Sequence, residues 1–178
     1  MPAKQDAIAL LKADHRKVED LFEKFEKARD ARRKQSLATE ICTELTIHAT
    51  IEEEILYPDC KDAVEDDLLD ESYVEHDGAK VLIAEISAGS PDDDFYDAKV
   101  KVLSEMIKHH VKEEERPGDG LFAQLRKADL DLVEMGERLK VRKAQLAKKL
   151  AGVDLPPPET RSFTGHELVQ SKPLEARA

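Results

Sequence analysis

The chain has 178 residues and a formal net charge of −11; 38% of its residues are charged, 4% are aromatic and none is tryptophan, which favours one all-helical domain with a real core. The acidic balance, without a basic stripe, argues against a nucleic-acid partner, and no apolar stretch approaches the ~20 residues needed to span a bilayer. Residues 1–6 lack the apolar core of a signal peptide, so we expect a cytoplasmic protein without a membrane partner.

The first two predicted helices each carry polar residues in an apolar stripe. The first covers about residues 6–31, and its apolar residues recur at alternating steps of three and four, as expected of a helix that faces a bundle core. The second is predicted to begin near Ser36, a favourable N-cap, and to run to about Tyr57, where Pro58 disturbs it. Three polar residues fall in core positions of these stripes: His15, His48 and Glu52.

The next two predicted helices repeat this arrangement. They cover about residues 67–88 and 92–116. In the last of them the stripe through His110 is more apolar than the neighbouring register through His109 and Glu113, so the pattern favours His110 as the inward residue. The polar residues predicted at core positions of these two helices are His76, His110 and Glu114.

The rest of the chain divides into a helical segment and a tail. After the break at Pro117–Gly120, a further helical segment with one interruption is predicted over about residues 121–150. From there on the composition shifts to proline and polar residues, which is typical of a flexible segment. We therefore expect an all-α domain in residues 1–150 and a proline-containing flexible tail in residues 151–178.

One pattern occurs twice in the predicted helices: a lone histidine is followed, 33 or 34 residues later, by His-x-x-x-Glu. Residues four apart lie on one helical face, so each pair can direct a nitrogen and a carboxylate to one point. A single pair of this kind is usually a solvated ion pair. The repetition within apolar stripes favours a metal site, because a buried carboxylate must be protonated, paired or metal-bound. The candidate ligands are His15, His48, Glu52, His76, His110 and Glu114.

Counting these ligands favours two metal ions. Four imidazole nitrogens and two bridging carboxylates give each ion two nitrogens and two oxygens, and a bridging oxo or hydroxo group would leave one position open for a small molecule. Mixed donors with open positions suit iron or manganese; zinc would also bind, although closed structural zinc sites usually use cysteine. The competing Glu-x-x-His motif of ferritin-like bundles does not occur in the chain.

With these segments in place, the chain resembles the hemerythrin-like family of HHE cation-binding domains. The match extends over about residues 5–150, and its segments are Ala13–Arg16, His48–Pro58, Glu75–Asp77 and His110–Glu115. The resemblance implies an up-down-up-down four-helix bundle, here with an additional C-terminal helical segment, around a non-haem di-iron centre. It also implies that His15, His48, His76 and His110 are terminal ligands and that Glu52 and Glu114 bridge the irons.

The resemblance also bears on function. Oxygen-carrying members of the family have a further histidine on the third helix, where this chain has Lys80. The chain is therefore more similar to the four-histidine, two-glutamate members that are associated with nitric oxide, peroxide and iron handling. We expect a di-iron protein that binds a small diatomic or peroxide ligand for sensing, storage or protection. The alternatives are an oxidoreductase that reduces nitric oxide or peroxide, and a metal-free helical interaction module; the sequence identifies no catalytic residue and no redox partner.

Other polar residues near the pattern are expected to have structural roles. Tyr73, one turn before His76, is predicted to be a core tyrosine with its hydroxyl at the rim, and contact with a metal is the alternative. Four glutamates beside the candidate bridging pair are predicted on solvated helix faces, and contact with a metal ligand is the alternative. These glutamates are Glu53, Glu54, Glu113 and Glu115.

Overall fold

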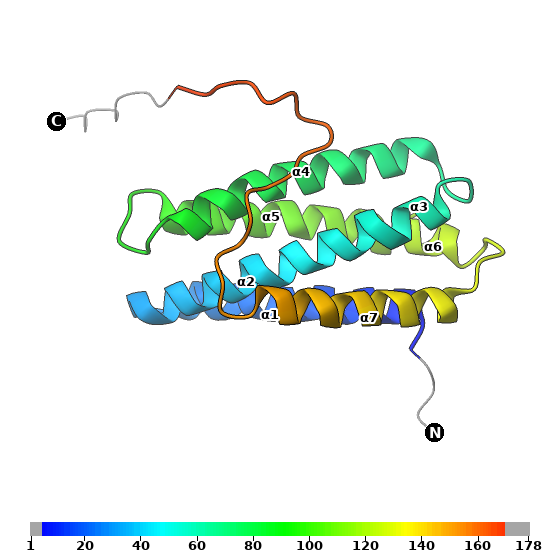
Figure 1. The fold of residues 1–178 in the computed structure, drawn as a ribbon, viewed down its shortest axis with the longest axis horizontal. Coiled ribbons are helices and arrows are strands. Elements are labelled where there is room, and N and C mark those ends of the chain that lie inside the picture. The colour runs from blue at the N-terminus through cyan, green and yellow to red at the C-terminus, as the bar shows by residue number, and fades with distance from the viewer. Residues whose placement is uncertain (1–4, 170–178) are drawn as a thin grey trace.

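The structure is a bundle of antiparallel helices, seen in a computed structural model that describes residues 5–169. Four long helices, α1, α2, α4 and α5, form an up-down-up-down bundle, and α7 packs along α1 and α2 (Figure 1). Residues 5–169 contain no strand, which confirms the all-α prediction, and none of their helices is long and apolar enough to cross a membrane. The elements are α1 (Ala7–Lys27), α2 (Ala31–Ile51), the π-helix η1 (Glu52–Leu56), α3 (Tyr57–Cys60), α4 (Asp66–Ala88), α5 (Tyr96–Glu115), α6 (Leu121–Leu125) and α7 (Leu132–Leu150).

An aspartate sets the boundary between the first two helices. Ala28 has extended backbone, so α1 ends at Lys27, and the Asp30 side chain accepts a hydrogen bond from the Arg33 amide at 2.9 Å. This N-cap satisfies one of the amides that have no partner within the first helical turn. The second helix therefore begins earlier than Ser36, the start predicted from the sequence.

A π-helical turn lies where the second helix was predicted to end. Pro58 cannot donate a backbone hydrogen bond and its ring crowds the carbonyl four residues earlier, yet the chain stays helical to Cys60. The turn Glu52–Leu56 widens the backbone just before the proline, and the Tyr57 amide donates to the Glu52 carbonyl, five residues back. This wider turn brings the side chain of Tyr57 to the same face of the helix as Glu52.

A layer of buried polar side chains separates two apolar clusters in the bundle. Along α1, for example, Leu11 belongs to one cluster and Val18 to the other, and His15 lies between them. The six predicted ligands all lie in this layer and each is at most 6% exposed. The apolar residues above and below the layer therefore bury these six side chains by filling the bundle on both sides.

The segment after α7 contacts the bundle instead of extending into solvent. Leu155 packs against both apolar clusters, and the backbone amides of Arg161 and Ser162 donate to the buried Asp77 of α4. The tail crosses from the end of α7 over α2 to α4 (Figure 1). Residues 155–162 of the predicted flexible tail thus make specific contacts with the bundle, while residues 170–178 lie outside the described residues.

Candidate metal centre

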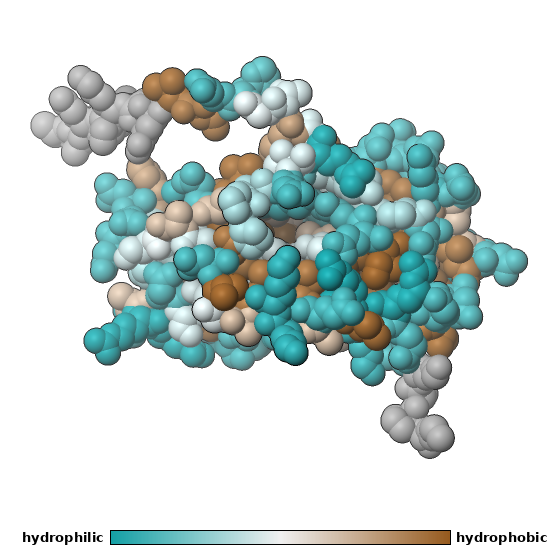
Figure 2. Space-filling view, viewed as in Figure 1, coloured by the Kyte–Doolittle hydropathy of each residue, from teal (hydrophilic) through white to brown (hydrophobic). Residues whose placement is uncertain are grey.

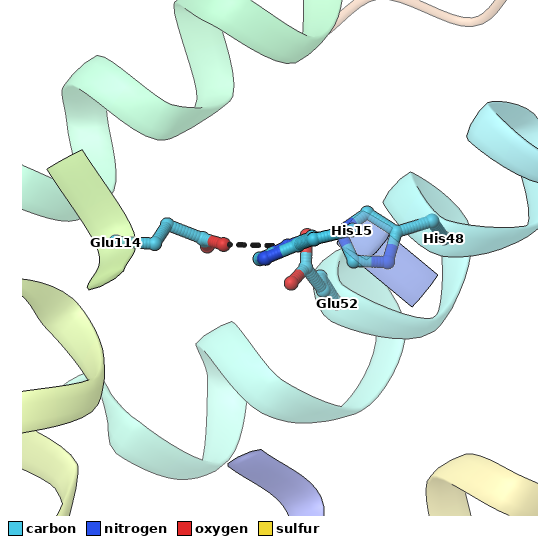
Figure 3. Close-up of side chains that lie close together, drawn as sticks. All are labelled: His15, His48, Glu52 and Glu114. Atoms are coloured by element: carbon cyan, nitrogen blue, oxygen red, sulfur yellow. Dashed lines mark hydrogen bonds and ion pairs between the residues drawn. The ribbon is translucent and has the colours of Figure 1, made fainter. Parts of the chain in front are cut away.

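The structure brings the six predicted ligand side chains together in the middle of the bundle. The Nε2 atoms of His15 and His48 lie 3.2 Å apart, and those of His76 and His110 lie 3.3 Å apart. Each hairpin, α1–α2 and α4–α5, therefore contributes one pair of imidazoles. In Figure 3, Glu114 reaches from α5 toward His15, with His48 and Glu52 beside it.

The two glutamates each lie between the two histidine pairs. Glu52 Oε2 is 3.3 Å from His48 Nε2 and 3.4 Å from His76 Nε2. The Glu114 carboxylate is 3.3 Å from His15 Nε2 through one oxygen and 3.6 Å from His110 Nε2 through the other. This arrangement places both carboxylates between the two histidine pairs, where a metal ion would find nitrogen and oxygen ligands together.

Outer carboxylates lie beside the second nitrogen of all four histidines, and three of these nitrogens make a direct hydrogen bond. The Nδ1 atoms of His15, His76 and His110 donate to Glu115, Glu53 and Glu75 at 2.8, 3.0 and 2.8 Å, respectively. His48 Nδ1 lies 3.7 Å from Asp14 Oδ2, beyond direct hydrogen-bond distance. A carboxylate on Nδ1 fixes the ring so that Nε2 faces inward, and it makes that nitrogen a stronger donor to a metal.

A sequence signal for these outer carboxylates was present in the repeat. An acid directly precedes each lone histidine (Asp14 and Glu75), and an acid directly follows each candidate bridging glutamate (Glu53 and Glu115). The prediction of solvated faces is therefore wrong for Glu53 and Glu115, which contact histidines of the opposite hairpin. The other two glutamates do pair at the surface: Glu54 with Arg142 and Glu113 with Arg116.

Basic side chains surround the outer carboxylates. Lys80 is bonded to Glu53 and Asp77, not to either candidate bridging glutamate. His109 is 58% exposed and approaches the Glu75 carboxylate at 3.4 Å. The structure thus places His109 outside the inner cluster that holds His110, and it places the ammonium of Lys80 in the second layer of the centre.

Two aromatic rings cover the inner histidines. Phe122 of α6 stacks on His15 with ring centroids 5.8 Å apart, and Tyr57 stacks on His76 at 5.6 Å. The Tyr57 hydroxyl lies 3.3 Å from His76 Nε2 and 3.4 Å from Glu52 Oε2. Tyr73, the tyrosine singled out in the sequence, packs edge-on against Tyr57. Sequence reasoning missed Tyr57, because the π-helical turn that directs it inward has no signature in the helical period.

Charges within the layer balance without a metal only if some histidines are protonated. Burial lowers the pKa of His15, but the Glu114 carboxylate, 3.3 Å away, and the negative charge of Glu52 outweigh burial and raise that pKa to about 9. The pKa of His76 is likewise raised to about 9 by Glu52 and Glu53, against the effect of burial. Burial raises the pKa of Glu114, and the positive charges of His110 and His15 more than reverse this, to about 2.

The carboxylate oxygens of the layer also fit a metal. Among the described residues, Glu52 Oε1 and both carboxylate oxygens of Glu114 are buried without a hydrogen-bond donor. Leaving a charged oxygen buried and unsatisfied costs several kcal/mol, on the order found for unpaired buried ions. Nitrogen and carboxylate ligands that converge around such oxygens form a donor set that could hold a metal ion.

A small cavity of about 30 Å³ lies against this layer. Its walls include all four inner histidines and apolar side chains of the second cluster, among them Val18, Leu45 and Ile107. A cavity of this size holds a molecule no larger than a water or two. Any ligand that the centre takes from this side would therefore be a small, weakly polar molecule.

Comparisons with known proteins agree with this geometry. The family model described as the hemerythrin HHE cation-binding domain matches residues 6–125. A protein of Nostoc sp. (strain PCC 7120) described as a DNA nickase is 29% identical over 145 residues, and the match covers 80% of this chain but only 40% of that protein. A crystal structure of an HHE cation-binding domain-containing protein from Mycobacterium kansasii has a TM-score of 0.69 and 23% identity, covering 81% of this chain and 88% of that one, which shows a shared fold. The chain belongs to the hemerythrin HHE cation-binding domain family.

Proposed function

We propose that the protein is a non-haem di-iron protein that binds a small ligand, such as oxygen, nitric oxide or peroxide, in sensing, storage or stress protection. The observation that carries this proposal is the set of three buried carboxylate oxygens without hydrogen-bond donors, surrounded by four inward-facing imidazole nitrogens. When bound, two irons with an oxo or hydroxo bridge would supply open coordination positions and redox chemistry. Manganese and zinc are the alternative metals.

In this proposal, different groups of residues hold the metals, orient the ligands and admit the small molecule. The four imidazoles would hold the metals, and Glu52 and Glu114 would bridge them. The outer carboxylates would fix the imidazoles, as they do by direct hydrogen bonds for His15, His76 and His110. The apolar cavity beside the layer would admit a diatomic or peroxide ligand and limit access of bulk water.

Metal analysis tests the proposal directly. Protein produced with iron, or reconstituted from the metal-free form, is expected to hold about two irons per chain, by ligand count. Its oxidised form is expected to absorb in the near ultraviolet and to change its spectrum on addition of azide or nitric oxide. Much less than two metals per chain after reconstitution would overturn the proposal and favour a helical interaction module.

Substitution of His48 and His110 by leucine distinguishes that interaction module from a metal centre. If the histidines only fill the core, the double variant retains or gains stability and loses no metal. If they are ligands, the variant loses its metals while the unfolding free energy of the metal-free protein is retained or rises, because apolar side chains replace buried polar ones.

A di-iron oxidoreductase that reduces nitric oxide or peroxide is the second candidate. Tyr57 favours it, since a buried hydroxyl 3.3 Å from His76 Nε2 could supply a proton beside the centre. Repeated turnover with an added reductant would support this candidate, and a spectral change without turnover would support ligand binding alone.

We do not carry DNA nicking over from the Nostoc relative. This chain spans about 40% of that protein, and its net charge of −11 works against binding a polyanion. The cytoplasmic location and the absence of nucleic-acid and membrane partners remain parts of the proposal.

A further inference from the structure

The segment of residues 155–162, called the strap below, crosses a surface groove between α2, α4 and α7. The groove has a volume of about 860 Å³, and residues 155–159 of the strap form part of its wall. In the space-filling view this face of the molecule is hollowed beside the strap (Figure 2). The strap therefore lies where a small molecule would approach the bundle from this side.

The strap is held by a fully buried carboxylate. Asp77 Oδ2 accepts hydrogen bonds from the Arg161 amide at 2.8 Å, from the Ser162 amide at 2.6 Å and from the Ser162 hydroxyl at 2.7 Å. The guanidinium of Arg161 lies 4.6 Å from the ring centroid of Tyr73. Because Asp77 is 0% exposed, these bonds satisfy a charge that water does not reach, so they hold the strap at a defined position.

Lys80 connects the strap with the metal centre. Its ammonium donates to the Glu159 carbonyl of the strap at 3.1 Å, to Glu53 at 2.9 Å and to Asp77 at 3.3 Å. Glu53 in turn accepts the hydrogen bond from His76 Nδ1. Strap, lysine, outer carboxylate and candidate ligand thus form one continuous chain of hydrogen bonds.

Lys80 also stands between the outer groove and the inner cavity. Lys80 and Ile83 line both the groove and the cavity of about 30 Å³ that touches the four inner histidines. With its ammonium bonded to three groups, the lysine side chain is held across this boundary. A molecule that entered the cavity from the groove at this point would meet the Lys80 side chain.

We propose that Lys80, held in place by the strap, is the gate that controls access of small ligands to the metal centre. This inference rests on the proposed function, and it adds the route by which small ligands reach the centre and the side chain that controls their passage. Release of the strap removes one of the three partners of Lys80, the Glu159 carbonyl, and uncovers the lysine on the groove side, so its side chain can move into the groove. Opening of the strap then sets the rate at which small ligands arrive and leave.

The test compares two strap variants in the full-length, iron-loaded protein. Ser162→Pro removes the amide and the hydroxyl that bind Asp77, and Thr164→Pro places the same residue at an exposed position beyond that contact. Stopped-flow measurement of azide binding is expected to give association and dissociation rates that are both about tenfold higher in Ser162→Pro, with an unchanged dissociation constant. Thr164→Pro is expected to match the unmodified protein.

A second pair of variants tests the lysine itself. Lys80→Met removes the ammonium and keeps the length of the side chain, and Lys108→Met makes the same change at an exposed lysine of α5. Lys80→Met is expected to raise both azide rates, as the strap variant does, and Lys108→Met to leave them unchanged. Equal rates in all variants would overturn the gate. So would an altered dissociation constant with unaltered dissociation rates, because a gate changes both rates together.

Two measurements separate failure of the gate from failure of the proposed function. Uptake of Co²⁺ by the metal-free protein, followed by its absorption bands, is expected to be faster in Ser162→Pro than in Thr164→Pro. Hydrogen exchange at the Arg161 amide is expected to be faster in Ser162→Pro and in Lys80→Met, with or without metal. Normal metal content with unchanged rates rejects only the gate, and no metal in any variant rejects both proposals.

Discussion

The two halves of the centre use the same ligand chemistry but are held by different parts of the chain. In the α1–α2 half, Asp14 approaches His48 and is itself bound by Lys143 of α7. In the α4–α5 half, Glu75 holds His110 by a direct hydrogen bond of 2.8 Å. One half is thus supported by an added helix, and the other by a longer acidic side chain.

This difference shows how a repeated pattern becomes asymmetric in a fold. The two lone histidines have equivalent contacts, since His15 and His76 each donate a hydrogen bond to a carboxylate of the opposite hairpin. The covering rings are not alike: Phe122 stacks on His15, and Tyr57, with a hydroxyl, stacks on His76. The His76 side of the cluster therefore has a hydroxyl that the His15 side lacks, so the two histidine pairs have chemically different surroundings.

The largest expected effect comes from removing a residue that both halves share. Glu52→Ala and Glu114→Ala each delete a carboxylate that faces both histidine pairs. We expect each variant to lose nearly all of its bound metal, because one remaining shared carboxylate would not offset the repulsion between two cations held this close together. Metal analysis after reconstitution measures this, with Glu113→Ala as the surface control. Retention of one metal would show that the halves bind independently.

A pH titration of the metal-free protein tests whether protonated histidines in both halves, His15 and His76, stabilise the fold. The pKa values of His15 and His76 are raised to about 9, above the ordinary histidine value of 6.5. Their contribution to stability is complete below pH 6.5 and is lost as the pH rises through 9. Urea unfolding is therefore expected to show falling stability of the metal-free protein between pH 7 and 9.5. The metal-loaded protein should not follow this decline, since metal replaces the protons.

Substituting the outer carboxylates sharpens the comparison between the halves. Glu75→Gln removes the charge from a 2.8 Å contact with His110, and Asp14→Asn removes it from a 3.7 Å contact with His48. Metal affinity is expected to fall roughly 10–100-fold in Glu75→Gln, as for outer partners of metal-bound histidines, and less in Asp14→Asn. Competition with a chelator measures both affinities. Equal losses would indicate that Asp14 acts on His48 through its charge and not through a hydrogen bond.

The smallest expected effect is that of the Tyr57 hydroxyl. Tyr57→Phe keeps the ring that stacks on His76 and removes one weak hydrogen bond, so the unfolding free energy should change by about 1 kcal/mol or less. Metal content should stay the same, and the spectrum of the loaded protein should shift because the centre loses a polar neighbour. An unchanged spectrum would show that the two halves are equivalent at the metals.

The sequence alone determined the helices and the six inward-facing side chains. The step of three and four residues fixes which face of each helix is apolar, so residues placed on those stripes, such as His48 and Glu52, must enter the core. The same register separated His110 from its neighbour His109, which the structure leaves exposed. The N-cap of the second helix was predicted wrongly, since the helix begins after Asp30 and not near Ser36.

Only the tertiary structure decided which groups surround that cluster. Glu53 and Glu115 find their histidines on the opposite hairpin, 23 and 100 residues away in sequence, and no helical period relates such positions. Tyr57 is turned inward by a π-helical turn, and Ser162 is held by a carboxylate 85 residues earlier. A periodic pattern reports which face of a helix is buried, but contacts between distant segments depend on how the helices are packed. The six buried polar side chains were therefore readable from the sequence, and the partners of the outer carboxylates and of the strap were not.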